Sequence, residues 1–291
     1  MANLKEIRNR ITSVSSTMQI TSAMKMVSAS KLRRAQDAIQ QLRPYAAKLN
    51  EIMGNLSGSI SSEGLFTQKR DGDQLLIITV SSNRGLCGAF NSNVIKETRR
   101  LIEEHKQSKQ ITVLSIGKKA EDYFKKTDYG IGGTTLPKNL SSVYDNLNFD
   151  YVSEIAKKII TAYGSKQFDE ILLVYNEFKN AAVQNVISEN FLPILPPPED
   201  TSATKSGDYI FEPDKELIVE EMIPKSLKIQ LYKAILDSYA AEHGARMTAM
   251  HKATDNASEL IKELKLSYNK ARQAAITGEI LEIVAGAEAL N

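Results

Sequence analysis

The 291-residue sequence has little of the chemistry that metal and thiol sites require. It contains one cysteine, Cys87, and three histidines, His105, His243 and His251, which lie far apart along the chain. A single cysteine excludes an internal disulfide, and a chain without disulfides suits a reducing compartment. Isolated histidines do not have the spacing of a zinc site. We therefore expect no metal centre, no cofactor and a Cys87 that behaves as a small buried hydrophobic residue.

Long apolar runs are also missing. No stretch of 18 apolar residues occurs, although 42% of the residues are hydrophobic. A membrane-spanning helix needs about 20 consecutive apolar residues. Residues 1–10, MANLKEIRNR, have no apolar core of the kind found in export signals. We expect a globular chain with a packed core, no membrane span and no export signal.

Phosphate-binding motifs are incomplete. The stretch ITVSSNRGLCGAFN (78–91) has the form of a strand, a glycine turn and a helix, which is where many α/β proteins bind phosphate. It lacks the GK[ST] end of a Walker loop, and Gly85 and Gly88 alone do not make a GxGxxG fingerprint. The GIGG motif at 130–133 is weaker still. We interpret the glycines as permitting a tight turn, and we find no Ser/His/Asp set or carboxylate pair that predicts a catalyst.

Positive charge gathers at the N-terminus. Residues 1–60 contain nine Lys and Arg against three acids, whereas the whole chain has a formal net charge of only +2. A basic helix of this kind commonly meets nucleic acid, anionic lipid or an acidic protein surface, or it is simply a solvated face. Charge alone leaves all four alternatives open.

The same segment has an unbroken heptad frame. One set of seam positions is Leu4, Ile11, Met18, Lys25, Leu32, Ile39, Ala46 and Met53, and the other is Ile7, Val14, Thr21, Ser28, Ala35, Leu42, Leu49 and Leu56. Mostly apolar residues at this spacing predict a coiled-coil helix from about residue 3 to 56. Three adjacent polar positions, Thr21, Lys25 and Ser28, predict that the partner helix departs there or that something other than a helix packs against them. Pro44 predicts a bend near residue 40.

The middle of the chain alternates strand and helix patterns. Strands are expected at 75–80, 111–117, 170–178 and, antiparallel, within 181–194; helices are expected at 89–106, 118–126 and 151–164. Such alternation predicts a doubly wound, Rossmann-like α/β layer structure. The composition of residues 196–208 predicts a loop.

A second long helix is expected from 226 to 288, after Pro224, with a seam rich in Ala, Ser and Gly. The expected organisation is therefore an N-terminal coiled-coil helix (1–60), an α/β domain (70–212) and a C-terminal coiled-coil helix (213–291). The two terminal helices pair most simply as an antiparallel coiled coil. From Ala274 to Leu290 the second helix is apolar on nearly every face, so we expect something outside the chain to cover it.

Three segments carry a resemblance to a known family. Residues 4–36, residues 81–91 and residues 268–290 closely resemble the gamma subunit of F-type ATP synthases, bacterial type. The last segment fits the family signature with Ile276, Thr277, Glu279, Glu282, Gly286 and Ala287. The resemblance implies a non-catalytic central rotor stalk that turns inside a ring of three alpha and three beta subunits. It implies that the α/β domain contacts epsilon and the membrane c ring, on the cytoplasmic face of the bacterial inner membrane, and that nucleotides bind to the ring subunits. It does not imply nucleic-acid binding.

The resemblance also implies site residues. Met24 and Lys25 match the family's region that faces a beta-subunit lever, and Arg272, Gln273, Thr277 and Glu279 match contacts that couple rotor to stator. Ile283 and Val284 would lie in an apolar sleeve of the ring. Two other classes stay open: an independent coiled-coil tether with a regulatory α/β module, and an α/β nucleotide-binding enzyme with helical extensions.

Overall fold

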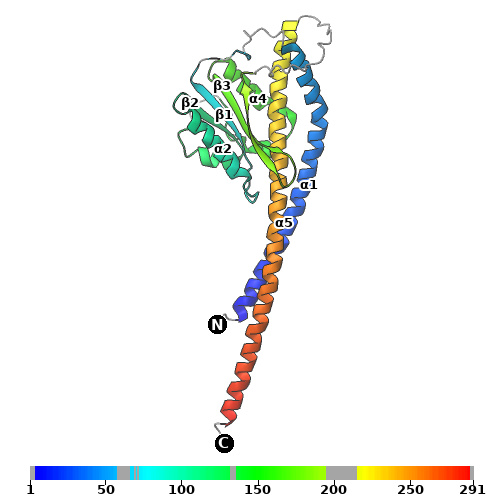
Figure 1. The fold of residues 1–291 in the computed structure, drawn as a ribbon, viewed down its shortest axis with the longest axis vertical. Coiled ribbons are helices and arrows are strands. Elements are labelled where there is room, and N and C mark those ends of the chain that lie inside the picture. The colour runs from blue at the N-terminus through cyan, green and yellow to red at the C-terminus, as the bar shows by residue number, and fades with distance from the viewer. Residues whose placement is uncertain are drawn as a thin grey trace. The chain divides into compact units, whose positions relative to one another are not determined.

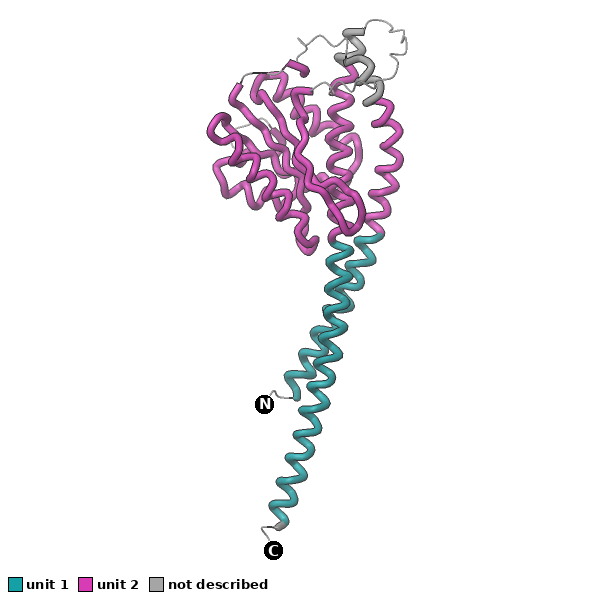
Figure 2. The backbone as a smooth tube through the Cα atoms, viewed as in Figure 1, with its two compact units in different colours: residues 1–29, 246–291 teal, residues 30–245 magenta. Residues whose placement is uncertain are grey.

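The computed structural model divides the chain into two units. It describes residues 4–57, 66–68, 70, 72–131, 136–194 and 215–288. One unit combines residues 1–29 with residues 246–291, and the other consists of residues 30–245 (Figure 2). The predicted loop at 196–208 and the second half of the GIGG motif lie outside the described residues.

The first unit is a pair of antiparallel helices. It is formed by parts of α1 (Leu4–Ser57) and α5 (Lys215–Glu288). The direction follows from two contacts, because Thr21 bonds Thr254 whereas the earlier Arg8 donates to the later Tyr268. The predicted antiparallel coiled coil is therefore confirmed.

One expectation for this unit is wrong. The polar stretch of the seam does not release the partner helix, because the hydroxyls of Thr21 and Thr254 lie 2.9 Å apart in a hydrogen bond. Each hydroxyl has a single proton, so one threonine donates across the seam and the other donates to a carbonyl of its own helix, that of Met18 or Met250. Paired hydroxyls satisfy each other at a buried seam position, so the two helices remain in contact there.

Both terminal helices pass through a proline. Pro44 lies inside α1 and Pro224 lies inside α5. The expected start of the second helix at residue 226 is wrong, because α5 begins at Lys215. A proline inside a helix removes one backbone donor, but Ile223 and Leu227 on either side of Pro224 are buried in the core of the second unit, and their packing outweighs the proline.

The second unit contains a four-stranded sheet with the order β2-β1-β3-β4 (Figure 1). The strands are β1 (Gln74–Val80), β2 (Gln110–Ile116), β3 (Glu170–Phe178) and β4 (Gln184–Leu192). β1 pairs in parallel with β2 and β3, and β4 runs antiparallel to β3 as predicted.

Helices cover both faces of this sheet. They are α2 (Phe90–His105), α3 (Lys118–Phe124) and α4 (Phe149–Gly164), with a short 3-10 helix, η1 (Leu140–Tyr144). Alternation along β1 divides the core, since Leu76 and Ile78 pack with α4 and α5 whereas Leu75 and Ile77 pack with α2 and α3. This two-sided arrangement confirms the predicted doubly wound α/β layers.

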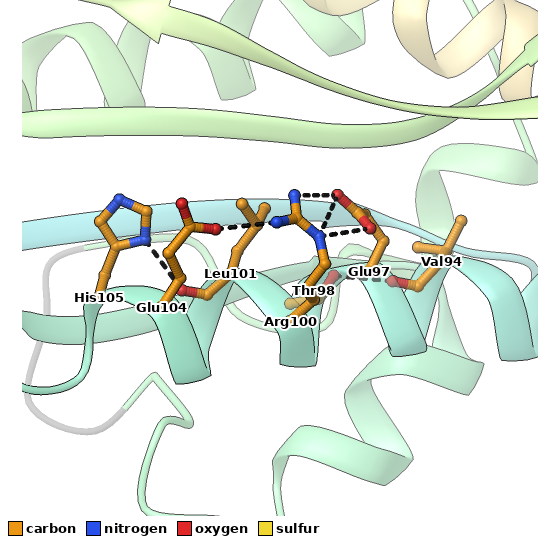
Figure 3. Close-up of polar contacts among 7 residues, drawn as sticks. All are labelled: Val94, Glu97, Thr98, Arg100, Leu101, Glu104 and His105. Atoms are coloured by element: carbon orange, nitrogen blue, oxygen red, sulfur yellow. Dashed lines mark hydrogen bonds and ion pairs between the residues drawn. The ribbon is translucent and has the colours of Figure 1, made fainter.

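Helix α2 contacts the sheet with one side and carries a group of ion pairs on another (Figure 3). On its inner side Thr98 bonds Thr79 of β1 at 3.0 Å and donates to the carbonyl of Val94. On another side, where Glu97 also lies beside Ser188 of β4, the Arg100 guanidinium lies 2.7 Å from a Glu97 oxygen and 2.9 Å from a Glu104 oxygen. The hydrogen bond from Arg100 lowers the pKa of Glu97. Exposed pairs of this spacing stabilise a helix by only about 0.2–0.5 kcal/mol each, so burial of the inner face holds α2 in place.

An ionisable group is buried where α5 packs in the second unit. Asp237 is 6% exposed. Burial raises its pKa from the ordinary 3.8 to about 6; Lys233 and Arg43 oppose the rise, and Glu177 and Glu189 add to it. The folded chain therefore holds a proton on this carboxyl more tightly than the unfolded chain does.

Asp237→Asn is expected to flatten part of the pH dependence of stability. Because the folded pKa is raised, the parent loses stability as pH rises from about 4 to about 6, by up to about 3 kcal/mol for a shift of this size. Asparagine does not ionise, so that decline should be absent. Urea unfolding of both chains between pH 4 and 7 measures the difference. The exposed Asp122→Asn is the control, and an unchanged decline in the Asp237 variant would contradict the assignment.

Candidate functional site

The end of α5 is an exposed apolar helix. Its large apolar side chains are 45% to 71% exposed: Ile276, Ile280, Leu281, Ile283 and Val284. An exposed apolar surface on several faces of a helix marks a site where a partner binds. The described residues of this unit do not cover it, so the predicted need for an outside partner remains.

The position of α1 explains this exposure. Arg8 donates a 2.7 Å hydrogen bond to the Tyr268 hydroxyl, and its guanidinium lies 5.6 Å from the centre of that ring. Extending the antiparallel pairing places Leu4, the first described residue of α1, opposite Arg272. Beyond that level α5 continues to Glu288.

The residues expected to couple rotor to stator fall in two places. Arg272, Gln273, Thr277 and Glu279 are all exposed on the last turns of α5. Lys25 and its neighbour Met24 are half-buried on α1, close to the level of the Thr21–Thr254 contact. At 1.5 Å per residue the two levels are roughly 30 Å apart, so the structure does not bring the sets together.

Sequence analysis missed an apolar surface beside Met24. Ile20 is 59% exposed, Met26 is 65% exposed and Val27 is 58% exposed, all on α1. Ile20 and Val27 are seven residues apart and therefore share one face of the helix, away from the seam. Apolar residues at non-seam heptad positions are the signal that could have identified this face.

The glycine turn between β1 and α2 is closed by its own side chains. The Ser82 amide donates to Asn91 Oδ1 at 3.0 Å, and Asn91 Nδ2 lies 2.8 Å from Ser82 Oγ and 3.2 Å from Cys87 Sγ. Cys87 is 1% exposed, which confirms it as a buried small residue. Gly88 adopts a φ of 59°, a left-handed conformation suited to glycine.

The crevice beside this turn is filled. In doubly wound sheets, ligands bind at the carboxyl ends of the strands where the strand order reverses, here between β1 and β3. The Tyr144 hydroxyl donates to the Ser81 carbonyl at 2.8 Å, just after β1. Ala241 of α5 is fully buried against Cys87 and Phe90. The chain's own helix thus occupies the place where a nucleotide would bind.

The isolated chain is therefore expected to bind ATP no tighter than millimolar. Neither a lysine-hydroxyl pair nor an open crevice is present in the glycine turn. Isothermal titration calorimetry of the isolated chain with Mg-ATP measures this directly. A stoichiometric micromolar site would favour the nucleotide-binding enzyme instead.

A metal site and a membrane-spanning helix are both absent from the described parts of the chain. Those residues contain no group of three His, Cys, Asp or Glu side chains placed to hold a metal ion. Among the same residues, no helix combines the length and apolar character needed to cross a bilayer.

Comparison with known proteins agrees with this geometry. A family model described as ATP synthase matches residues 3–290. Proteins named ATP synthase gamma chain from Flavobacterium johnsoniae and Christiangramia forsetii are 59% and 55% identical over the full length of both chains. Among solved structures, the chain is similar to one chain of the central stalk and c-ring structure of Tetrahymena thermophila mitochondrial ATP synthase, with a TM-score of 0.57 and 24% sequence identity. The match covers 80% of this chain and 99% of the Tetrahymena chain. A chain of the Euglena gracilis OSCP/F1/c-ring structure has TM-score 0.69 and 22% identity, covering 99% and 94%.

The fold and the exposed helix end define a class of proteins in which an antiparallel coiled coil carries an inserted α/β domain. Sequence identity of 55% to 59% with several bacterial relatives, over the full length of both chains, then specifies the family. The chain belongs to the ATP synthase gamma chain family. The resemblance seen in the sequence is confirmed.

Proposed function

We propose that this chain is the central rotor stalk of a bacterial F-type ATP synthase. It turns inside a ring of alpha and beta subunits and couples transmembrane ion flow to ATP synthesis, or ATP hydrolysis to ion pumping, without catalysing a bond change itself. Its α/β domain (70–212) contacts epsilon and the c ring at the cytoplasmic face of the inner membrane. The terminal regions, 1–60 and 213–291, form the axle. Full-length identity to gamma chains supports this assignment.

The observation that carries the proposal is the uncovered end of α5. Ile283 and Val284 are 71% and 55% exposed on adjacent faces of one helix, so one partner helix could not cover both. A sleeve formed by a ring could. Just before this end, Arg272 would provide a rigid donor fork, Gln273 an amide that donates and accepts, and Thr277 a short hydroxyl, for contacts with a beta subunit.

Reconstitution tests the proposal against its alternatives. Purified chain is mixed with alpha and beta subunits, and the products are separated by size and assayed for ATP hydrolysis. If the chain is the rotor subunit, each ring should bind one copy of it. A probe attached to the α/β domain should then rotate while the ring hydrolyses ATP. A coiled-coil tether would give no stoichiometric ring complex, and that result would overturn the proposal.

Binding of the chain to the ring is expected to weaken with salt. The N-terminal helix is strongly basic, and Lys31, Arg33 and Arg34 are among its exposed cations. Exposed charge pairs are screened beyond about 8 Å at physiological ionic strength. Affinity measured at 50 and 500 mM KCl should fall about tenfold or more, mainly through slower association. Equal affinities at both concentrations would exclude an acidic surface as the partner of this helix.

A further inference from the structure

Helix α5 contains a small-residue stretch where it passes the end of the sheet. Ala240 and Ala241 are fully buried, and Gly244 is buried one turn further along. Glycine inside a helix is about 1 kcal/mol less favourable than alanine, so its place there calls for a packing reason.

That reason is a close backbone approach. A Cβ atom at Gly244 would lie 3.2 Å from the Ala181 Cα, 3.3 Å from a Phe178 ring carbon and 3.4 Å from the Ala181 carbonyl oxygen. Phe178 ends β3 and Ala181 lies in the turn to β4. The β3–β4 hairpin therefore meets α5 at the one position of this turn that has no side chain.

The hairpin is a stiff element. Asn180 Oδ1 accepts hydrogen bonds from the amides of Ala182 and Val183 at 2.9 and 2.8 Å, and the Asn180 amide donates to the Val183 carbonyl. The Gln184 side chain donates to the Ala181 carbonyl at 3.1 Å. With the turn closed by its own bonds, a displacement of Ala181 is transmitted to β3 and β4.

The same face of α5 also packs on the glycine turn, and we call the space between this turn and the hairpin the notch. Ala241 contacts Cys87 and Phe90, and the Phe90 carbonyl accepts a hydrogen bond from Asn176 of β3. Since Ala241 and Gly244 are three residues apart, they lie on one face of α5. Turning the helix by the angle of one residue, about 100°, would replace Gly244 with the larger His243 or Ala245. Packing of Gly244 on the hairpin and of Ala241 on the glycine turn therefore favours the observed rotational setting of α5.

We propose that Gly244 is a positioning residue that fixes the rotation of α5 relative to the α/β domain, so that torque carried by the helix reaches the sheet. This inference rests on the rotor function proposed above. Because α5 is continuous from this notch to the exposed end, twist generated at that end reaches Gly244 along the helix. Close-packed interiors have low compressibility and transmit strain, which is what a torque joint requires.

The test compares leucine and alanine at this position. Gly244→Leu should push the hairpin away, whereas Gly244→Ala needs a shift of only a few tenths of an ångström and gains helix propensity. Each chain is assembled with the ring, and the angular fluctuation of a probe on the α/β domain is measured during ATP-waiting pauses. In the leucine variant the variance of the probe angle should be about twofold or more above that of the parent, while the ring hydrolyses ATP near the parent rate. The alanine variant should show the parent variance. Lys225→Leu, which places the same side chain at an exposed position of α5, is the control.

A cross-link keeps the inference testable if the leucine variant does not fold. Ala181→Cys with Gly244→Cys, oxidised by copper phenanthroline, joins the hairpin to the helix. Rotation should continue at the parent rate with unchanged or smaller variance. Rotation lost on oxidation and regained on reduction, or parent-like variance in an assembled leucine variant, would overturn the inference. Failure of the parent complex to rotate would instead overturn the proposed function.

Discussion

Replacing both Ile283 and Val284 with lysine is expected to leave the isolated chain helical and to reduce coupled activity of the assembled complex about tenfold or more. Burial of each apolar side chain in a partner is worth about 1.5–3 kcal/mol, and an unpaired ammonium group adds a desolvation cost. Both residues are exposed in the chain alone, so their replacement removes no internal packing. Circular dichroism of the isolated chain and ATP-driven ion pumping by the complex measure the two effects.

The control places two lysines slightly earlier on the same helix. Ser267→Lys with Asn269→Lys changes two exposed polar positions and adds the same charge. That variant should assemble and pump close to the parent level. Normal pumping by the Ile283 and Val284 variant would exclude an apolar sleeve at these positions. Loss of helix in the isolated variant would mean that the two residues serve internal folding.

Gly117→Ala is expected to destabilise the second unit by about 3 kcal/mol or more, the combined scale of backbone strain and overpacking. Gly117 has a φ of 100°, and a Cβ atom there would lie 2.1 Å from the Ser81 carbonyl oxygen. Backbone atoms cannot move aside as a flexible side chain can. The clash also disturbs Ser81 Oγ, which accepts a hydrogen bond from the Ala120 amide at the start of α3.

Urea denaturation of the isolated chain, followed by tyrosine fluorescence, measures this loss. Gly85→Ala is the matched control, since the nearest atom to a Cβ there is the end of the Lys119 side chain at 4.0 Å. Its effect should stay within about 0.5 kcal/mol. Equal midpoints for the Gly117 variant and the parent would show that the β1–α2 and β2–α3 turns can separate without cost.

Regular patterns in the sequence predicted most of the fold. Heptad positions such as Ile7, Leu32 and Leu49 are buried, because the seam positions of a seven-residue repeat all lie on the side of the helix that faces its partner. Local chemistry was less informative where tertiary contacts decide the outcome. The Thr21–Thr254 bond joins residues 233 positions apart, and no pattern around Thr21 alone indicates its partner. The early start of α5 at Lys215 is a similar case, decided by packing around Pro224.

Only part of the candidate site could be predicted from the residue pattern of the sequence. The apolar end of α5 was visible in the sequence because its composition violates the usual amphipathic pattern. Met24, Lys25, Arg272, Gln273, Thr277 and Glu279 came from family resemblance, and their coupling role stays a prediction. The exposed Ile20 and Val27 were missed, since a surface apolar residue becomes informative only when its exposure is known.

The crevice filled by α5 also constrains how the chain is made. β1 is complete at Val80 and β4 at Leu192, yet the core between sheet and helix includes Leu231, and the crevice is closed by Ala241. A ribosome synthesises the sheet first and the residues that cover it last. The growing chain therefore exposes apolar sheet surface until α5 emerges, which makes this stage of synthesis the one most open to aggregation or chaperone binding. A chain released before Ala241 would carry an unfilled crevice, so complete folding of the α/β domain requires that translation has passed Ala241.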